Sequence, residues 1–329
     1  MPQSADPVEL TRALINLDTV NPPGNEEAAA RFLGALLMEG GLQVNYHVLA
    51  EGRMGLVACL KGESAAPPLC FCGHLDTVPP GGAAWQSPPL EARLSAGKIY
   101  GRGASDMKSG LAAMTAAALS LAAVPRRRAD VVMIFTAGEE TGSEGACRMV
   151  REGVLPAVVG ALVVGEPSSN APFLGHKGAL WLRCHARGKS AHGSMPEQGE
   201  NAILKAARAV LALEDLLVQD LPHPKLGRPT LNVGTINGGT KINMVPDLAD
   251  FTLDFRTVPG LVHDELHQRV CDRLGPALEV SRLLDLPPVL TAENDPWVRK
   301  VLNLLEQKGT SSRPGYVNYF TDASILPPA

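Results

Sequence analysis

Apolar positions along the first half of the chain follow two patterns that alternate. Spacings of three and four residues predict helices over residues 7–17, 25–39 and 110–123. Short runs rich in branched residues predict strands over residues 44–49, 56–60, 69–72, 131–135 and 161–164. The last two runs are continuously apolar, which is typical of strands buried on both faces. Alternating strands and helices indicate an α/β layer fold.

The predicted helix over residues 25–39 has recognisable signals at both ends. Asn21-Pro22-Pro23-Gly24 breaks the chain before it. Asn25, followed by the acidic pair Glu26-Glu27, is typical of a capped first turn. Gly40-Gly41 indicates where the helix ends.

The pattern changes after Gly178. The following elements are predicted as a strand over 180–186, a helix over 201–218, strands over 230–236 and 250–255, a helix over 262–274 and a strand over 278–282. This β-α-β-β-α-β order is that of a ferredoxin-like domain. We therefore predict an inserted domain over residues 178–284. The first domain comprises residues 1–177 and 285–329, and resumes with a helix over 296–307.

Composition and charge narrow the class of protein. Apolar residues make up 45% and charged residues 19% of the 329 residues, and the net charge is -4. A nucleic-acid-binding protein would show a concentrated basic field, whereas Arg126-Arg127-Arg128 is interpreted as a solvated turn. No stretch approaches the roughly 18 apolar residues of a membrane-spanning helix. Met1–Asp6 lacks the features of a signal peptide. We expect a cytoplasmic protein without nucleic-acid or membrane partners.

The cysteines fit the same location. They mostly lie inside apolar runs, at Cys59, Cys70, Cys72, Cys147, Cys184 and Cys271. The one-residue spacing of Cys70 and Cys72 matches neither a C-x-x-C redox pair nor a zinc knuckle. We expect buried, reduced thiols.

Four segments of the first domain place His or acidic residues at strand ends or in the loops that follow, where open α/β sheets bind ligands. They carry His74 with Asp76, then Asp106, the pair Glu139-Glu140, and Glu166. His74 and Asp76 are two residues apart, so in an extended chain their side chains point the same way. Asp76 either holds the imidazole directly or orients the site less directly.

Each segment also has a structural explanation. Asp106 or Ser105 could cap the next helix, Glu139-Glu140 could form an acidic turn before a helix near Glu144, and Glu166 could end a strand in a cap or turn. Adjacent carboxylates after an apolar strand nevertheless favour a cation, which would offset their repulsion. Together the segments predict a site of oxygen ligands with one or two imidazoles, which suits zinc, manganese or cobalt.

These segments resemble the M20 family of metallopeptidases and deacylases, in particular the acetylornithine deacetylase and succinyl-diaminopimelate desuccinylase branch. The resemblance covers nearly the whole chain, and three segments carry it in combination: residues 73–79 (GHLDTVP), residues 101–110 (GRGASDMKSG) and residues 138–143 (GEETGS). It implies a zinc-exopeptidase-like catalytic domain, with a mixed sheet flanked by helices, and an inserted ferredoxin-like lid and dimerisation domain.

The resemblance also implies roles for individual residues. His74 and Glu166 would bind one zinc ion, Glu140 would bind a second, and Asp106 would bridge the two. Glu139 would be the general base, and Asp76 would support His74.

In the inserted domain, Arg187–Pro196 resembles the lid motif of the family. His192 would steady the oxyanion, often from the partner subunit of a homodimer. Asn243 and Arg256 also match lid positions. Arg256 could clamp a substrate carboxylate through its planar fork, or form a surface ion pair.

The chain departs from the family at its C-terminal end. The resemblance implies a further His ligand for the second metal, but the last histidine is His267. Thr321-Asp322-Ala323 resembles a segment that precedes that ligand in the family. Three explanations stay open: a truncated chain, a centre that works with one metal, or a relative that binds ligands without cleaving them.

The resulting expectation is metal-dependent hydrolysis of the amide bond of a small N-acyl amino acid. A dipeptidase or carboxypeptidase of the same family is the alternative enzyme, since the sequence does not reveal the preference of the substrate pocket.

Overall fold

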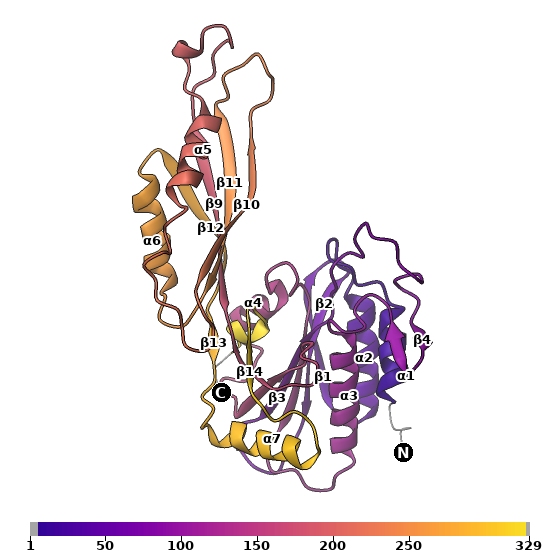
Figure 1. The fold of residues 1–329 in the computed structure, drawn as a ribbon. Helices are drawn as coiled ribbons and strands as arrows, with labels where there is room; N and C mark the ends of the chain where they lie inside the picture. The colour runs from indigo at the N-terminus through magenta and orange to yellow at the C-terminus, as the bar shows by residue number, and fades with distance from the viewer. Residues whose placement is uncertain (1–5, 327–329) are drawn as a thin grey trace. The chain divides into compact units, whose positions relative to one another are not determined.

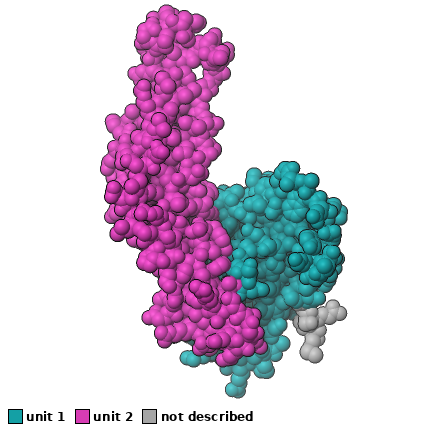
Figure 2. Space-filling view, viewed as in Figure 1, with its two compact units in different colours: residues 1–170, 321–329 teal, residues 171–320 magenta. Residues whose placement is uncertain are grey.

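Contacts between residues divide the chain into two units in the computed structural model, which describes residues 6–326 (Figures 1 and 2). Unit 1 contains residues 1–170 and 321–329, and unit 2 contains residues 171–320. Expectations that rest on residues 1–5 and 327–329, such as the lack of a signal peptide, lie outside the described residues.

The sheet of unit 1 is mixed, as the sequence predicts. Its order is β1 (Gln43–Ala50), β2 (Arg53–Leu60), β6 (Val131–Thr136), β3 (Leu69–His74) and β7 (Ala161–Val164). The β1/β2 and β2/β6 pairs are antiparallel, whereas β3 runs parallel to both β6 and β7. Three neighbouring strands therefore have their carboxyl ends at one edge of the sheet.

Helices pack on both faces of this sheet. The cluster on one face joins it to α1 (Pro7–Ile15), α2 (Glu27–Glu39) and α3 (Lys108–Ala122), and the cluster on the other includes Met149 of α4 (Glu144–Arg151) (Figure 1). Every residue of β6 is buried, because successive side chains enter opposite layers. The sequence predicted strands buried on both faces for β6 and for β7. The prediction is wrong for most of β7, where only the first residue is buried, because β7 lies at the edge of the described sheet.

The start of α2 differs from the sequence prediction. Asn25 does not cap it; the cap position is occupied by Glu26, whose side chain makes no capping hydrogen bond. The buried Glu26 carboxylate instead pairs with Arg53 at 3.0 Å. The predicted end is confirmed, with Gly40 at the C-cap and Gly41 at φ +87°.

Unit 2 contains the predicted ferredoxin-like fold. Its elements follow the β-α-β-β-α-β order: β9 (Gly178–Arg187), α5 (Ala202–Ala212), β10 (Thr230–Gly238), β11 (Leu248–Thr257), α6 (His263–Leu274) and β12 (Leu278–Leu286). The strands are antiparallel in the order β10-β11-β9-β12. One hydrophobic core joins the sheet to both helices (Figure 1).

A three-stranded sheet extends unit 2 beyond this domain. It pairs β13 (Val289–Leu290) with β8 (Phe173–His176), and β8 with β14 (Gly315–Val317). Residues 171–177 and 285–320, which contain the strands of this small sheet, belong to unit 2 by their contacts. The sequence assigns these segments to the first domain, and its boundaries at 177/178 and 284/285 stay a prediction.

Short elements complete the chain. They are the hairpin β4 (Arg93–Ser95) and β5 (Lys98–Tyr100), the 3-10 turns η1 (Pro196–Gln198) and η2 (Asp322–Ser324), and α7 (Pro296–Gln307). The bounds of α7 match the sequence prediction. No helix among the described residues combines the length and apolar character needed to cross a bilayer.

The core of unit 2 gives a first testable prediction. Phe251 in β11 is 0% exposed, whereas Phe173 in β8 is 40% exposed. Phe251→Ala should lower the free energy of unfolding by about 3–5 kcal/mol, since it leaves a cavity among packed side chains. Phe173→Ala should lower it far less. Guanidinium unfolding followed by circular dichroism measures both, and equal losses would contradict the assigned core.

Candidate metal centre

Three neighbouring parallel strands supply most of the centre. His74 is the last residue of β3, Glu139 and Glu140 follow β6, and Glu166 follows β7. Parallel strands present their carboxyl ends at the same edge, so residues far apart in sequence meet there. The register confirms this closeness, because His74 pairs with Thr136 at the end of β6.

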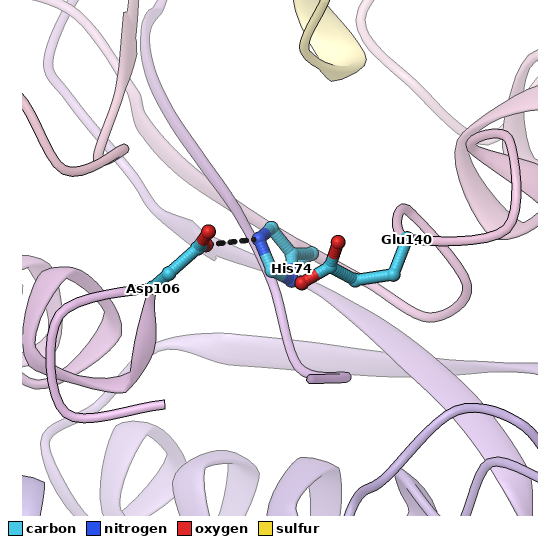
Figure 3. A group of neighbouring side chains, drawn as sticks. All are labelled: His74, Asp106 and Glu140. Carbon is cyan, nitrogen blue, oxygen red and sulfur yellow. Dashed lines mark hydrogen bonds and ion pairs between the residues drawn. The ribbon is translucent and has the colours of Figure 1, made fainter. Parts of the chain in front are cut away.

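The side chains predicted as metal ligands are brought together. His74 Nε2 lies 3.1 Å from Asp106 Oδ1 and 3.7 Å from Glu166 Oε1. Candidate ligand atoms of His74, Asp106 and Glu140 lie within 4.8 Å of one another. Figure 3 shows the carboxylates of Asp106 and Glu140 on either side of the imidazole ring. One imidazole and several carboxylate oxygens form a donor set that fits divalent ions such as zinc, cobalt or manganese.

The second ring nitrogen of His74 is held by backbone. His74 Nδ1 lies 2.9 Å from the backbone oxygen of Asp76 and 3.6 Å from its carboxylate. A proton on Nδ1 satisfies both and leaves Nε2 to face the acidic side chains. The imidazole is 1% exposed, so its orientation does not depend on solvent.

The Asp76 carboxylate mainly supports the turn after β6. Oδ1 accepts from the amides of Gly138 and Glu139 at 3.0 and 3.1 Å, and Oδ2 accepts from the amide of Glu140 at 3.2 Å. Both contacts that the sequence left open are present, since the backbone oxygen of Asp76 holds the imidazole and its carboxylate holds the turn, and the role of Asp76 stays a prediction. Asp76 orients the segment that carries Glu139 and Glu140, and it contacts His74 as an ion pair at longer range.

Asn21 is a further support that the sequence analysis missed. Its Nδ2 donates to Asp76 Oδ2 at 2.9 Å and to Thr141 Oγ1 at 3.0 Å. Asn21 is 3% exposed. The sequence analysis treated its segment as a chain break and as typical of the M20 family, but assigned Asn21 no role. The polar side chain beside two prolines was the available signal, but its partners lie 55 and 120 residues away.

Asp322 is the second missed residue. It begins η2 and is 2% exposed. Thr136 Oγ1, at the end of β6, donates to Asp322 Oδ2 at 2.5 Å. The sequence analysis noted Thr321-Asp322-Ala323 as a familiar segment but assigned it no role.

The structural explanation for Asp106 is wrong. The residue at the N-cap of α3 is Met107, and no side chain caps that helix. Close packing instead places the start of α3 beside the end of β7. A Cβ on Gly110 would lie 2.2 Å from the backbone oxygen of Gly165, so only glycine allows this approach. This approach brings the loop of Asp106 near Glu166.

Burial and mutual repulsion perturb the acidic groups. Burial raises the pKa of Glu139 well above its ordinary value, and the Asp322 charge adds to this while His74 opposes it. Burial, with the charge of Asp106, raises the pKa of Glu166 to about 7, again against His74. Burial likewise raises the pKa of Glu140. Acids that resist ionisation in the metal-free chain are the groups that a cation would stabilise.

For His74 and Asp76 the pKa shifts favour the charged form, unlike those of the three glutamates. Burial alone would lower the pKa of His74, but hydrogen bonding to Asp106 and Asp76 outweighs it and raises the pKa well above the ordinary value. Burial alone would raise the pKa of Asp76, but His74, and then Asn21, outweigh it and lower the pKa. In the metal-free chain these contacts favour the charged forms of both His74 and Asp76. A metal ion beside Nε2 would supply positive charge to the same acidic groups.

The lid residues lie in unit 2. His192 pairs with Met244 in an isolated bridge, and the Gly193 amide donates to the backbone oxygen of Asn243 at 2.8 Å, so His192 and Asn243 are neighbours. Arg256 lies near the far end of β11 and is not part of this group. Its guanidinium pairs with Asp254 at 3.0 Å and stacks over Phe320. The roles of all three residues stay predictions.

Two known protein families match parts of the chain. Residues 174–281 match the peptidase dimerisation domain of the M20 family, and residues 55–160 match peptidase family M28. The first match coincides with the ferredoxin-like domain. The second covers strands β2, β3 and β6 with α3, where three of the four predicted metal ligands lie.

Curated relatives extend the similarity over almost the whole chain. A probable succinyl-diaminopimelate desuccinylase of Staphylococcus epidermidis is 30% identical over 95% of this chain and 82% of its own length. An acetylornithine deacetylase of Vibrio cholerae is 29% identical over 96% of this chain and 84% of its own length.

Solved structures share the fold at low sequence identity. An M20 family metallo-carboxypeptidase of Sulfolobus solfataricus matches with a TM-score of 0.80 at 19% identity, over 97% of this chain and 88% of its own. A tripeptidase of Staphylococcus aureus matches with 0.77 at 22%, over 98% and 87%. A dinuclear metal-binding M20 peptidase of Bacillus subtilis matches with 0.68 at 15%, over 97% and 84%.

The raised pKa values predict how pH affects the metal-free chain. The pKa of Glu166 rises from 4.5 to about 7 on folding, so between these values the folded chain binds more protons than the unfolded chain. The free energy of unfolding should therefore fall as pH rises. His74 acts in the same direction above its ordinary pKa of 6.5. The melting temperature of the metal-free chain should be lower at about pH 7.5 than at about pH 5.5.

Two variants test this assignment by calorimetry. Glu166→Gln should flatten the dependence, because it removes one of the groups that lose a proton. Glu51→Gln, at an exposed residue of unit 1, should leave it unchanged. Added Zn²⁺ should stabilise the chain more at the higher pH, where the ligands are deprotonated. Burial lowers the pKa of His47 and of His176, and this acts in the opposite direction. The decisive comparison is therefore between variants, and a pH dependence that Glu166→Gln leaves unchanged would contradict the assignment.

Proposed function

Because the chain belongs to the M20 peptidase family, whose members are hydrolases, we propose that it hydrolyses the amide bond of an N-acyl amino acid. The proposed substrates are of the N-acetylornithine or N-succinyl-diaminopimelate type, after the relatives with the names given above. The observation that carries the proposal is the convergence of His74, Asp106, Glu140 and Glu166 at one edge of the sheet, with Glu139 beside them. This arrangement has the groups that metal-assisted hydrolysis requires.

The proposed centre holds two divalent ions. His74 and Glu166 would hold one, Glu140 would hold the other, and Asp106 would bridge them with its two oxygens. The short distances from His74 Nε2 to both Asp106 and Glu166 support the first position. The partial exposure of the Asp106 side chain leaves it accessible to a second ion. Metal analysis of the purified chain, with zinc, cobalt and manganese compared, tests identity and stoichiometry.

Glu139 is the proposed general base. The bound ions would make water a stronger acid and polarise the substrate carbonyl. Glu139 takes the proton of the attacking water and later delivers it to the nitrogen of the leaving amine. Its burial at 7% exposure suits this exchange, because bulk water has little access to the carboxyl group between the two steps.

The lid residues have proposed roles in binding. His192 would donate to the oxyanion, from the partner subunit of a dimer, and Asn243 would contact the substrate beside it. Arg256 would bind the substrate carboxylate. Asp254 accepts from its Nε and Nη2, and Nη1 offers two further donors, so an ion pair and a substrate contact are compatible.

A dipeptidase or carboxypeptidase activity is the second candidate. It is favoured by the fold similarity to the tripeptidase and the metallo-carboxypeptidase. Both activities use the same centre, so only the substrate separates them. Turnover should be measured with N-acetylornithine and N-succinyl-diaminopimelate, and in parallel with unblocked dipeptides and tripeptides. Faster turnover of the unblocked peptides would reject the deacylase proposal and keep the hydrolase.

Replacing the proposed base separates catalysis from metal binding. Glu139→Gln should lower kcat by about 10²–10⁴-fold, because the amide cannot accept the proton. Its Zn²⁺ affinity, measured by calorimetry, should stay close to that of the unmodified chain, since Glu139 is not a proposed ligand. Glu152→Gln is the matched control on the surface and should keep full activity. A Glu139→Gln chain that keeps its kcat would reject the proposed base.

We also propose a homodimer formed through β10 and α5. Within the described part of the chain, β10 is an edge strand with an unpaired side, and α5 packs next to it. Exposed apolar side chains gather on these elements and the loop after β10, at Ile203, Leu204, Leu211, Ile236 and Ile242. The match to the peptidase dimerisation domain covers the same residues. A second copy would cover both the apolar side chains and the strand edge.

A charge on the proposed edge tests this interface. Ile236 in β10 is 51% exposed, and Leu283 in β12, on the opposite edge, is 45% exposed. Ile236→Lys should shift the chain toward monomer in sedimentation velocity, since it would bury an unpaired charge. Leu283→Lys should leave the association unchanged. The interface would be wrong if the two variants behaved alike.

A cytoplasmic location completes the proposal. The six cysteines form no disulfide, and Cys70, Cys72 and Cys184 are buried. Burial raises the pKa of the Cys184 thiol to about 12, so it resists oxidation. Unpaired thiols are usual in reducing compartments. Fractionation of cells that express the chain tests the location.

A further inference from the structure

The turn that carries Glu139 and Glu140 is held at more than one point. The Asp76 carboxylate binds the amides at its centre. At its start, Thr136 Oγ1 donates to Asp322 Oδ2 at 2.5 Å, across 186 residues of sequence. This hydrogen bond connects the end of the strand that precedes the general base and a candidate ligand to the last described segment of the chain.

This hydrogen bond is shielded from water. Thr136 is 0% exposed and Asp322 is 2% exposed, so the bond does not compete with solvent in the intact chain. A second acceptor for the Thr136 hydroxyl, the Gly73 backbone oxygen, lies farther away at 3.4 Å. Burial raises the pKa of the Asp322 carboxyl, and the contacts with Thr136 and then with Ser143, at the far end of the turn, oppose this rise. A buried carboxylate with a hydroxyl donor forms one of the stronger hydrogen bonds in a protein.

The position of Thr136 connects the bond to the whole centre. Thr136 ends β6 and pairs in register with His74 at the end of β3. Only two residues, Ala137 and Gly138, separate it from Glu139. Gly138 has φ +78°, so the chain turns sharply between Thr136 and Glu139.

We propose that Asp322 is a positioning residue of this site: by holding Thr136 it fixes the strand end from which Glu139 and Glu140 reach the reaction centre. The proposal rests on the proposed amide hydrolysis at that centre. Asp322 does not bind the substrate or the metal in this proposal. It acts through Thr136, and small displacements of a catalytic group are enough to lower turnover strongly.

The competing explanation is a purely structural bond that stabilises unit 1. Both explanations predict a lower melting temperature when the bond is lost. They differ in the kinetics and in the local behaviour of residues 137–143. A structural bond would leave kcat unchanged in the molecules that are folded, whereas a positioning bond would lower kcat with little change in KM.

Four variants test the bond itself. Asp322→Ala removes the acceptor, and Thr136→Val removes the donor while keeping a branched side chain of similar size. Each should lower kcat roughly 10- to 100-fold, the usual effect of losing a side chain that orients a metal site. The double variant should be no slower than the slower single variant, because both changes delete one interaction. Thr136→Ser keeps the hydroxyl and should restore most of kcat.

The matched control lies at the other end of the same strand. Asp130 immediately precedes β6, and its carboxylate accepts from Lys61 Nζ at 2.8 Å and from the Gly62 amide at 2.8 Å. Asp130→Asn also weakens a bond that ties β6 to a distant segment. It should reduce stability without lowering kcat, because it does not contact the turn of residues 137–143.

A second readout does not require activity or metal. In the metal-free chain, hydrogen–deuterium exchange of the amides of residues 137–143 should be faster in Asp322→Ala and Thr136→Val than in the unmodified chain. Exchange should stay slow in Thr136→Ser and in Asp130→Asn. If Asp322→Ala does not fold, Thr136→Val, with its serine counterpart, decides the question alone.

The outcomes separate the two proposals. If the unmodified chain hydrolyses none of the substrates, the proposed function fails, while the exchange measurement still tests whether Asp322 holds the turn. If the unmodified chain is active and folded Thr136→Val keeps its kcat and slow exchange, the positioning role is overturned. Additive effects of the two single variants would overturn it as well, because they would show that Asp322 and Thr136 act independently.

Discussion

The site depends on the hydrogen bonds that the buried Asp76 carboxylate accepts. This carboxylate lies two residues beyond the end of β3 and accepts the amides of Gly138, Glu139 and Glu140, which follow β6. Asn21 holds it from a third segment. The backbone oxygen of Asp76 holds the imidazole of His74. A single buried anion therefore orients both a candidate ligand and the candidate base, and its burial is possible because four donors surround it.

The electrostatics of the centre follow from this packing. Parallel strands bring several carboxylates to one edge of the sheet, where burial disfavours their ionised forms. In the metal-free chain the raised pKa values of His74 and Glu166 both act to reduce the repulsion. Divalent ions would reduce the repulsion between these carboxylates further, because they carry more charge. Metal binding would therefore also stabilise the folded chain. The supporting residues Asn21, Asp76 and Asp322 then determine where the acidic groups point.

Unit 2 is organised around an apolar core and an exposed sheet edge. Its sheet has one core shared with α5 and α6, and an edge at β10 with exposed apolar side chains. Such an edge is stable when another strand or subunit covers it. The candidate lid residues are spread over this unit, with His192 and Asn243 together and Arg256 near the other end of β11. A substrate would therefore contact them through separate groups.

The sequence by itself determined the elements with strong periodicity and pointed to the residues of the acidic site. The helix over 296–307 and the ferredoxin-like order were readable, because spacing is a local property. The motifs also named His74, Asp106, Glu140 and Glu166, which the structure brings together, while their roles as ligands stay a proposal. The roles of Asp76, Asn21 and Asp322 were decided only by tertiary structure. Their partners lie 55 to 186 residues away, and no local pattern encodes a hydrogen bond between distant segments. Strand pairing, which brings those segments together, is a property of the whole sheet.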